Sequence, residues 1–287
     1  MPVARPNRAW LNQAVTSVLE QRDVELELVI VDDGSEPSVR ELLDSVEDPR
    51  LRILRMEARG VAHARNAGLA AVRGQYVRFA DADDVLELDS TARLLGLATD
   101  GSIAYGATLV CDEALEPQSV RKSNLQGRVD EACLLGGFDV RLPALLFPRA
   151  VVDASGGWDP EFPVCSDWDF VLRTLEHAQV RGDGVPAVRY RRHSASLTRT
   201  ASLQEAETAW KRVVARYFGR HPEQCGTPLE RRARTMLALH WARSYAYRGE
   251  SRAWVERLLA GFRADPVAAL REAPRLLVLS LRGAGRG

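Results

Sequence analysis

Three aspartates within four residues form the stretch of this sequence with the clearest chemical meaning. Asp81, Asp83 and Asp84 directly follow an apolar run with the composition of a strand, residues 76–80. Carboxylates this close repel one another, so a nearby cation favours their ionised forms. Mg²⁺ commonly binds one or two carboxylates together with phosphate oxygens of a substrate. The cluster therefore predicts a metal bridge to a diphosphate or, as a plainer alternative, an Asp-rich turn that caps the next helix.

Aspartates at two more places in the sequence lie where a carboxylate can reach a ligand. Asp32 and Asp33 end an apolar run over residues 26–31. A carboxylate there can accept hydrogen bonds from a nucleobase or a ribose hydroxyl, and it can equally cap the next helix. Asp167 follows a loop that contains Gly and Pro, at the start of a helical pattern. It fits either a helix N-cap or a general base that takes a proton from an acceptor hydroxyl.

Two basic residues complete the set. Arg65 lies on a helical pattern over residues 61–72 that is otherwise rich in small residues. Its guanidinium suits a phosphate or a base, and it suits equally well an ion pair with a nearby carboxylate. His193 follows an arginine-rich strand pattern that ends at residue 191. We predict either a metal or phosphate contact for His193 or an ordinary surface position.

The elements that must position these residues alternate between strand and helix patterns in the first part of the chain. Strand patterns occupy residues 26–31, 51–56, 75–80, 103–110, 142–147 and 185–191. Helical patterns lie between them, for example at residues 61–72, 88–98 and 167–178. This alternation predicts an α/β fold with a mostly parallel sheet flanked by helices. Ligands of open α/β sheets bind at the carboxyl ends of strands, which is where both Asp clusters lie.

Only helical patterns follow. They occupy residues 203–219, 228–248, 251–263 and 266–282. We therefore predict a first domain over residues 1–200 and an all-helical region over residues 201–287. The last pattern combines leucines with arginines. We expect it to pack in a helical bundle, and peripheral contact with an anionic membrane surface is the alternative.

Composition excludes several classes of protein. The 39 Lys and Arg residues balance the 39 Asp and Glu residues, so a nucleic-acid partner is not expected. The sequence has no apolar run of about 18 residues, which predicts that no segment spans a membrane. Its four cysteines are widely spaced and form no metal-binding pattern. These features predict a cytoplasmic protein.

Taken in order, the motifs resemble those of family 2 glycosyltransferases over residues 7–199. The matching blocks are residues 28–35, 60–68, 74–76, 81–85, 146–149, 156–159, 166–173 and 190–193. The resemblance implies a GT-A fold and transfer of a sugar, with inversion, from a nucleotide-diphosphate donor to an acceptor hydroxyl. It also implies dependence on Mn²⁺ or Mg²⁺. The acceptor could be a glycan, a lipid-linked intermediate or a secondary metabolite.

The resemblance also implies roles for individual residues. Asp33 would hold the nucleobase and Arg65 the nucleotide. Asp81 and Asp83 would form the D-x-D motif, with Asp83 binding the metal directly. His193 matches a position that ligates the metal in some members of the family.

Asp167 matches the family's catalytic base. The sequence departs from the family pattern in two respects. Ser166 stands where a Glu usually precedes the base, and the strand that usually opens the family's fold is missing before residue 7.

Two other functions stay open. The chain could be a non-catalytic relative that binds a nucleotide-sugar as a sensor or interaction protein. It could also be an interaction protein whose working part is the helical region, residues 201–287.

Overall fold

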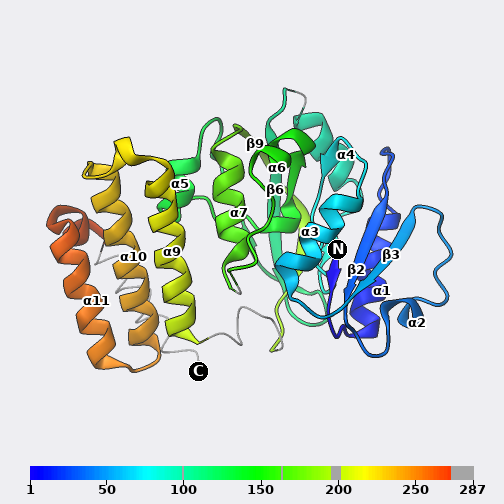
Figure 1. Cartoon of the computed structure of the whole chain (residues 1–287), viewed down its shortest axis with the longest axis horizontal. Helices are drawn as coiled ribbons and strands as arrows, with labels where there is room; N and C mark the ends of the chain where they lie inside the picture. Colours follow the sequence, from blue (N-terminus) through cyan, green and yellow to red (C-terminus); the bar gives the residue numbers. More distant parts are fainter. Residues whose placement is uncertain (99, 163, 195–201, 273–287) are drawn as a thin grey trace. The chain divides into compact units, whose positions relative to one another are not determined.

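The computed structural model describes residues 1–98, 100–162, 164–194 and 202–272 (Figure 1). The chain divides into two compact units. The first combines residues 1–130 with 138–196, and the second combines residues 131–137 with 197–287. Independent folding of two domains divided at residue 200 stays a prediction.

The first unit contains a small parallel sheet with the strand order β1-β2-β3. Its strands are β1 (Pro2–Val3), β2 (Leu28–Asp33) and β3 (Leu51–Met56), and Figure 1 shows β2 beside β3. The expectation that the first strand is missing was therefore wrong. Two residues are too few to produce a strand pattern, and this strand is defined by its parallel pairing with residues 31 and 32.

Alternation of side chains explains why β2 is apolar throughout. Leu28 and Ile30 belong to a cluster that includes Leu11, whereas Val29 and Val31 pack with Ala64. Successive side chains of a strand point to opposite faces. Helix α1 (Arg8–Leu19) therefore covers one face of β2 and α3 (Val61–Ala71) covers the other.

The second sheet is mixed. Its strand order is β4-β8-β6-β9-β5. The sixth strand, β7, is not part of this sequence of neighbours and pairs with β6. Within the described residues only β6 and β9 of this sheet run parallel, so the prediction of a mostly parallel sheet was wrong in this detail. Local sequence patterns report that a strand exists but carry no information about its direction. The strands are β4 (Tyr76–Val77), β5 (Val85–Leu86), β6 (Ile103–Cys111), β7 (Pro117–Arg121), β8 (Leu145–Pro148) and β9 (Val180–Arg191).

Helices in the first unit follow the predicted patterns, and several are shorter than predicted. Asn7 caps α1 through its side chain, which accepts hydrogen bonds from the N–H groups of Ala9 and Trp10. Helix α3 begins after Gly60, whose φ of 95° suits a residue without a Cβ atom. The remaining helical elements are α2 (Val39–Leu42), α4 (Ser90–Leu97), η1 (Leu142–Ala144), α6 (Arg149–Ala154) and α7 (Ser166–Leu175).

Close packing between β6 and β9 gives a stability prediction. A Cβ atom on Gly106 would lie 2.6 Å from Cβ of Ala187 and 2.7 Å from the carbonyl oxygen of Val185. The Gly106→Ala variant is expected to lose about 1–3 kcal/mol of unfolding free energy, because neither neighbour can move without moving the strand. Urea denaturation measures this loss.

A matched control lies on α4. Gly96 lies within this helix, and a Cβ atom added to it would have no other heavy atom within 4 Å. The Gly96→Ala variant is therefore expected to be neutral or slightly stabilising, since Ala is the better helix former. Equal destabilisation of the two variants would contradict the packing argument.

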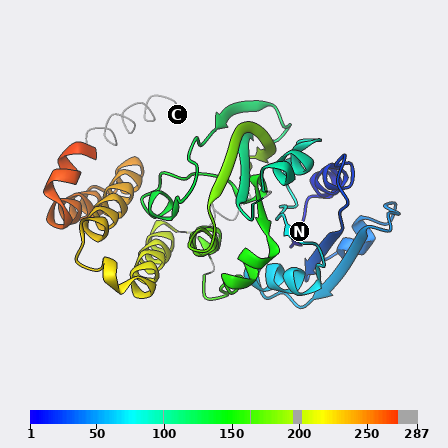
Figure 2. The ribbon, with the colours of Figure 1, turned by 90° about the horizontal axis from the view of Figure 1, so that it is seen from above.

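The second unit is helical, as predicted. Its helices are α5 (Asp130–Leu134), α9 (Leu203–Arg220), η2 (Pro222–Gln224), α10 (Pro228–Tyr247) and α11 (Ser251–Ala264). Figure 2 shows α9, α10 and α11 side by side, and α10 packs against both of the others. Glu207 of α9 is buried and accepts hydrogen bonds from Arg257 of α11 and Tyr245 of α10, which ties the three helices together.

The predicted last helix lies only partly in the described region. Residues 266–272 are helical, and Val267 and Leu270 are exposed there. The leucines at positions 276–281, on which the bundle and membrane alternatives depend, lie outside the described residues. Among the residues that are described, no helix has the length and apolar character needed to cross a membrane.

Candidate active site

The aspartate cluster lies in the turn between β4 and β5, and each of its three carboxylates has a different environment. Asp81 accepts a hydrogen bond from Arg65 over 3.1 Å. Asp83 lies 2.8 Å from Nε2 of His193, which follows β9. Asp84 is buried and accepts a hydrogen bond from the backbone N–H of Arg191. The fold thus brings together residues that are up to 110 positions apart.

Burial and mutual repulsion raise the pKa values of two of these groups. Burial is the larger cause of the raised pKa of the Asp83 carboxyl, and the nearby charge of Asp81 adds to it. The pKa of Asp84 is raised well above its usual range, again by burial first and then by the charges of Asp83 and Asp81. A bound cation would relieve this repulsion and favour the ionised carboxylates. Asp84 is buried, whereas the side chains of Asp81 and Asp83 are 31% and 36% exposed, so a turn that is solvated throughout does not describe the cluster.

Arg65 is held over an aromatic stack. Its guanidinium carbon lies 4.2 Å from the ring centroid of Trp158, and the Trp158 ring is parallel to that of Phe170, with 4.2 Å between centroids. Phe170 belongs to α7, the helix that carries Asp167. The stack therefore fixes Arg65 beside Asp81 and at the same time joins α3 to α7.

Asn66 joins α3 to the segment before α7 through hydrogen bonds to Trp158. Its side chain donates to the carbonyl oxygen of Trp158 and accepts from the N–H of Trp158, each over 2.8 Å. Both residues belong to predicted motif blocks, but sequence reasoning gave them no role. An Asn inside a helix of small residues was the available signal, because Asn is a poor helix former.

Asp33 lies at the carboxyl end of β2, as predicted. Its two carboxylate oxygens accept hydrogen bonds from the backbone N–H groups of Arg59 and Gly60, over 2.8 and 2.9 Å. Asp32 accepts in the same way from Ser35 and Val39. Asp33 therefore holds the start of α3 in place, and a contact with a nucleobase through its remaining lone pairs stays a prediction.

Asp167 lies in the first turn of α7 with an exposed side chain. Its Oδ1 atom accepts a hydrogen bond from the N–H of Trp168 over 2.9 Å. Asp169 differs sharply: it is buried and forms an ion pair with Arg173 over 2.7 Å. Of the two carboxylates on this helix, only Asp167 is open to a substrate, and Asp169 is structural.

His193 is buried rather than on the surface. Its ring centroid lies 4.7 Å from that of Trp10 on α1, and the guanidinium of Arg191 lies 5.0 Å from the same Trp10 ring. Sequence reasoning missed Trp10 and Arg191, because nothing in the local pattern of α1 or β9 indicates that these elements meet.

The donor groups of this cluster fit a hard divalent cation. In the described ranges, no group of three or more His, Cys, Asp or Glu side chains is arranged to hold a metal ion. Mg²⁺ needs only one or two protein carboxylates when phosphate oxygens and water supply the rest. Asp83 supplies one such carboxylate and His193 adds an imidazole nitrogen beside it, whereas Arg65 already engages one oxygen of Asp81.

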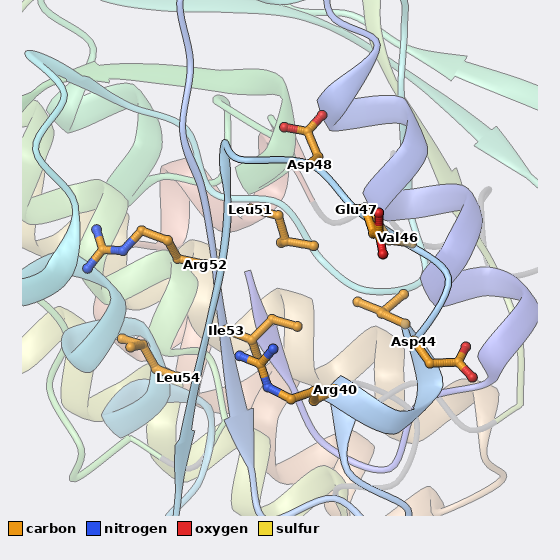
Figure 3. Close-up of a pocket in the computed structure, with 10 residues that line it drawn as sticks. Arg40, Asp44, Val46, Glu47, Asp48, Leu51, Arg52, Ile53 and Leu54 are labelled. Atoms are coloured by element: carbon orange, nitrogen blue, oxygen red, sulfur yellow. The ribbon is translucent and has the colours of Figure 1, made fainter.

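A separate hollow lies at the outer edge of β3. It has a volume of about 550 Å³ and is lined by β3 and by residues of α2 and the segment that follows it. In Figure 3, Leu51 and Ile53 point to one side of the strand and Arg52 and Leu54 to the other. None of the predicted site residues lines this hollow, so we do not assign it to the reaction.

A cluster of aspartates at the strand ends of such a fold is typical of nucleotide-sugar transferases, and solved structures confirm the fold. The crystal structure of S. aureus TarS 1-349 in complex with UDP matches with a TM-score of 0.64 and 15% identity, covering 96% of this chain and 84% of that one. Mannosyltransferase PcManGT from Pyrobaculum calidifontis in complex with GDP-Man and Mn²⁺ matches with a TM-score of 0.58 and 17% identity, covering 97% and 79%. The chain has the GT-A fold.

Sequence comparison finds the same similarity in the first part of the chain. The family model described as Glycosyl transferase family 2 matches residues 3–135. Succinoglycan biosynthesis protein ExoO of Rhizobium meliloti (strain 1021) is 30% identical over 176 residues, which are 60% of this chain and 46% of that protein. Residues 3–135 of the chain are thus similar to glycosyl transferase family 2. The chain spans less than two thirds of the length of several curated relatives that it matches.

Proposed function

We propose that this protein transfers a sugar from a nucleotide-diphosphate donor to an acceptor hydroxyl, with inversion and with dependence on Mn²⁺ or Mg²⁺. The observation that carries the proposal is the pair formed by Asp83 and His193, beside an arginine-bound Asp81. A carboxylate, an imidazole and a guanidinium at one strand end suit a metal–diphosphate group. The similarity of residues 3–135 to glycosyl transferase family 2 supports the same reaction.

Each site residue has a role in this proposal. Asp83 would hold the cation, with His193 as a second ligand and Asp81 as a further carboxylate beside it. Arg65 would contact the diphosphate, since its Nε atom is buried and has no hydrogen-bond partner among the described residues. Asp33 would contact the nucleobase. When bound, the metal would neutralise charge that develops on the leaving diphosphate.

Asp167 would act as the general base. Its carboxylate would accept the proton of the acceptor hydroxyl while the oxygen attacks the anomeric carbon on the side opposite the leaving group. A single displacement of this kind inverts the anomeric configuration. Exposure of Asp167 supports this role, because an acceptor must reach it from solvent.

The proposal leaves the identity of both substrates to experiment. The similar structure of TarS is a complex with UDP, and that of PcManGT is a complex with GDP-Man and Mn²⁺. Either nucleotide is therefore a reasonable first probe. Glycan, lipid-linked and secondary-metabolite acceptors all stay open, and the cytoplasmic location stays a prediction.

Metal-dependent nucleotide binding tests the proposal directly. UDP or GDP should raise the melting temperature more with Mn²⁺ present than with a chelator. A ligand at about 100 times its Kd adds about 2.7 kcal/mol to the unfolding free energy. The Asp83→Ala variant should lose the metal-dependent part of this gain, because it lacks the ligand that holds the cation.

Asp44→Ala is the control. Asp44 is exposed and lines the hollow beside β3, so its loss should leave the nucleotide effect unchanged. Equal stabilisation of the wild type with Mn²⁺ and with chelator would reject the metal role. Metal-dependent binding without turnover of any donor would instead favour a non-catalytic nucleotide-sugar-binding relative.

A further inference from the structure

Arg191 lies two residues before His193 and has an unusual set of hydrogen-bond partners. Its side chain is among the largest that are fully buried, at 1% exposure. Nε donates to the carbonyl oxygen of Asp83 over 2.9 Å, and a second nitrogen donates to the carbonyl oxygen of Glu113. The third nitrogen donates to Oε1 of Gln13 over 2.6 Å. The fork therefore binds neutral oxygens rather than a carboxylate side chain.

These contacts fix the backbone of the aspartate cluster from two directions. The side chain of Arg191 holds the carbonyl of Asp83, while its backbone N–H holds the carboxylate of Asp84 over 2.9 Å. Both Asp83 and Asp84 are thus hydrogen-bonded to Arg191, the last residue of β9. His193 follows two residues later and reaches the carboxylate of Asp83.

Helix α1 supports the arrangement from outside. Gln13 accepts the hydrogen bond from Arg191, and Trp10 lies three residues earlier on the same helix. Residues three apart lie on one face of a helix, so both side chains meet β9 together. The Trp10 ring contacts the guanidinium of Arg191 and the imidazole of His193.

We propose that Arg191, held by Gln13 and Trp10, is a positioning residue that sets the carboxylate of Asp83 opposite His193. The inference rests on the proposed function, because only there does this pair bind a metal. Groups that orient metal ligands commonly change metal affinity by about 10- to 100-fold when they are removed. Arg191 is almost fully buried, so in this proposal it acts through the residues that it holds.

Lysine cannot replace Arg191 in this role. The planar guanidinium presents donors in a fixed fork, and here the fork spans two carbonyls and an amide oxygen. An ammonium group keeps the charge but is a point donor at the end of a flexible stem. The Arg191→Lys variant should therefore keep the charge of the site and lose its geometry.

The experiment measures Mn²⁺ affinity by titration calorimetry in the presence of UDP or GDP, whichever stabilises the wild type more. Arg191→Lys is expected to weaken Mn²⁺ binding by about tenfold or more. Nucleotide affinity in chelator should stay at the wild-type value. Arg192→Lys is the matched control, since Arg192 is exposed, and it should bind Mn²⁺ like the wild type.

Two variants on α1 keep the test decisive if Arg191→Lys fails to fold. Gln13→Ala should also weaken Mn²⁺ binding, because it releases one arm of the fork. Trp10→Ala should do the same, whereas Trp10→Phe keeps an aromatic face and should restore affinity. Wild-type Mn²⁺ affinity in Gln13→Ala and Trp10→Ala would overturn the positioning role.

Asp83→Ala separates this proposal from the proposed function. If Asp83→Ala loses Mn²⁺ binding while Arg191→Lys and both α1 variants retain it, the positioning role is wrong and the metal site stands. If Asp83→Ala binds Mn²⁺ like the wild type, the metal site itself is wrong. The expected result is loss in Asp83→Ala and a smaller, graded loss in the positioning variants.

Discussion

Replacing Asp167 by asparagine is expected to lower sugar transfer by about 10²- to 10⁴-fold. The amide keeps the shape of the side chain and can still accept the hydrogen bond from the N–H of Trp168. It cannot take the proton of an acceptor hydroxyl. Nucleotide affinity should stay near the wild-type value, because Asp167 is assigned to the acceptor side of the site. Turnover assays at saturating donor, together with nucleotide titrations, measure both quantities.

Asp153→Asn provides the control for this variant. Asp153 is also an exposed carboxylate on a short helix, where it forms an ion pair with Arg149. Its replacement should leave turnover unchanged, because exposed ion pairs contribute little. Near-normal turnover in Asp167→Asn would show that this carboxylate only caps α7. The general base would then have to be another residue.

Replacing Trp158 by alanine is expected to destabilise the first unit by about 3–5 kcal/mol. The Trp158 ring is buried at 2% exposure and packs between Arg65 and Phe170, with Phe79 at its edge. Its removal leaves a cavity at the junction of α3 and α7. Arg65 and Phe170, on either side of this ring, belong to different helices, so the cavity cannot close without moving a helix. Chemical denaturation monitored by circular dichroism measures the loss.

Trp158→Phe separates the contribution of the stack from that of volume. A phenyl ring can still lie between the guanidinium and Phe170, so this variant should lose much less stability than the alanine variant. It should also keep more nucleotide affinity, because Arg65 keeps its platform. If phenylalanine and alanine have the same effect, aromatic stacking at this position has no measurable value.

The sequence alone indicated which acidic residues could perform the proposed chemistry, and it showed a resemblance to family 2 glycosyltransferases. Asp81, Asp83 and Asp167 could be proposed because this chemistry restricts the residue type at each position, and such restrictions are visible without a structure. The helices of residues 203–264 were equally predictable, since apolar residues at helical spacing record which face is buried. Glycine also follows closely after some of the helices, as Gly136 does after α5 and Gly156 after α6.

Only the tertiary structure decided how the strands pair. The first strand is two residues long and exists through hydrogen bonds to β2, so no local pattern could reveal it. The directions of β4, β5, β7 and β8 were equally hidden, since alternation along one strand is the same in parallel and antiparallel sheets.

The supporting residues of the site were likewise decided by tertiary contacts. Asn66 and Trp158 are 92 positions apart, and Gln13 and Arg191 are 178 apart. Arginine, tryptophan and glutamine occur in many ordinary surface and core positions, so their residue types gave no warning. The sequence determined which groups can perform the chemistry because that depends on functional groups. The structure determined which groups hold them in place because that depends on distances across the fold.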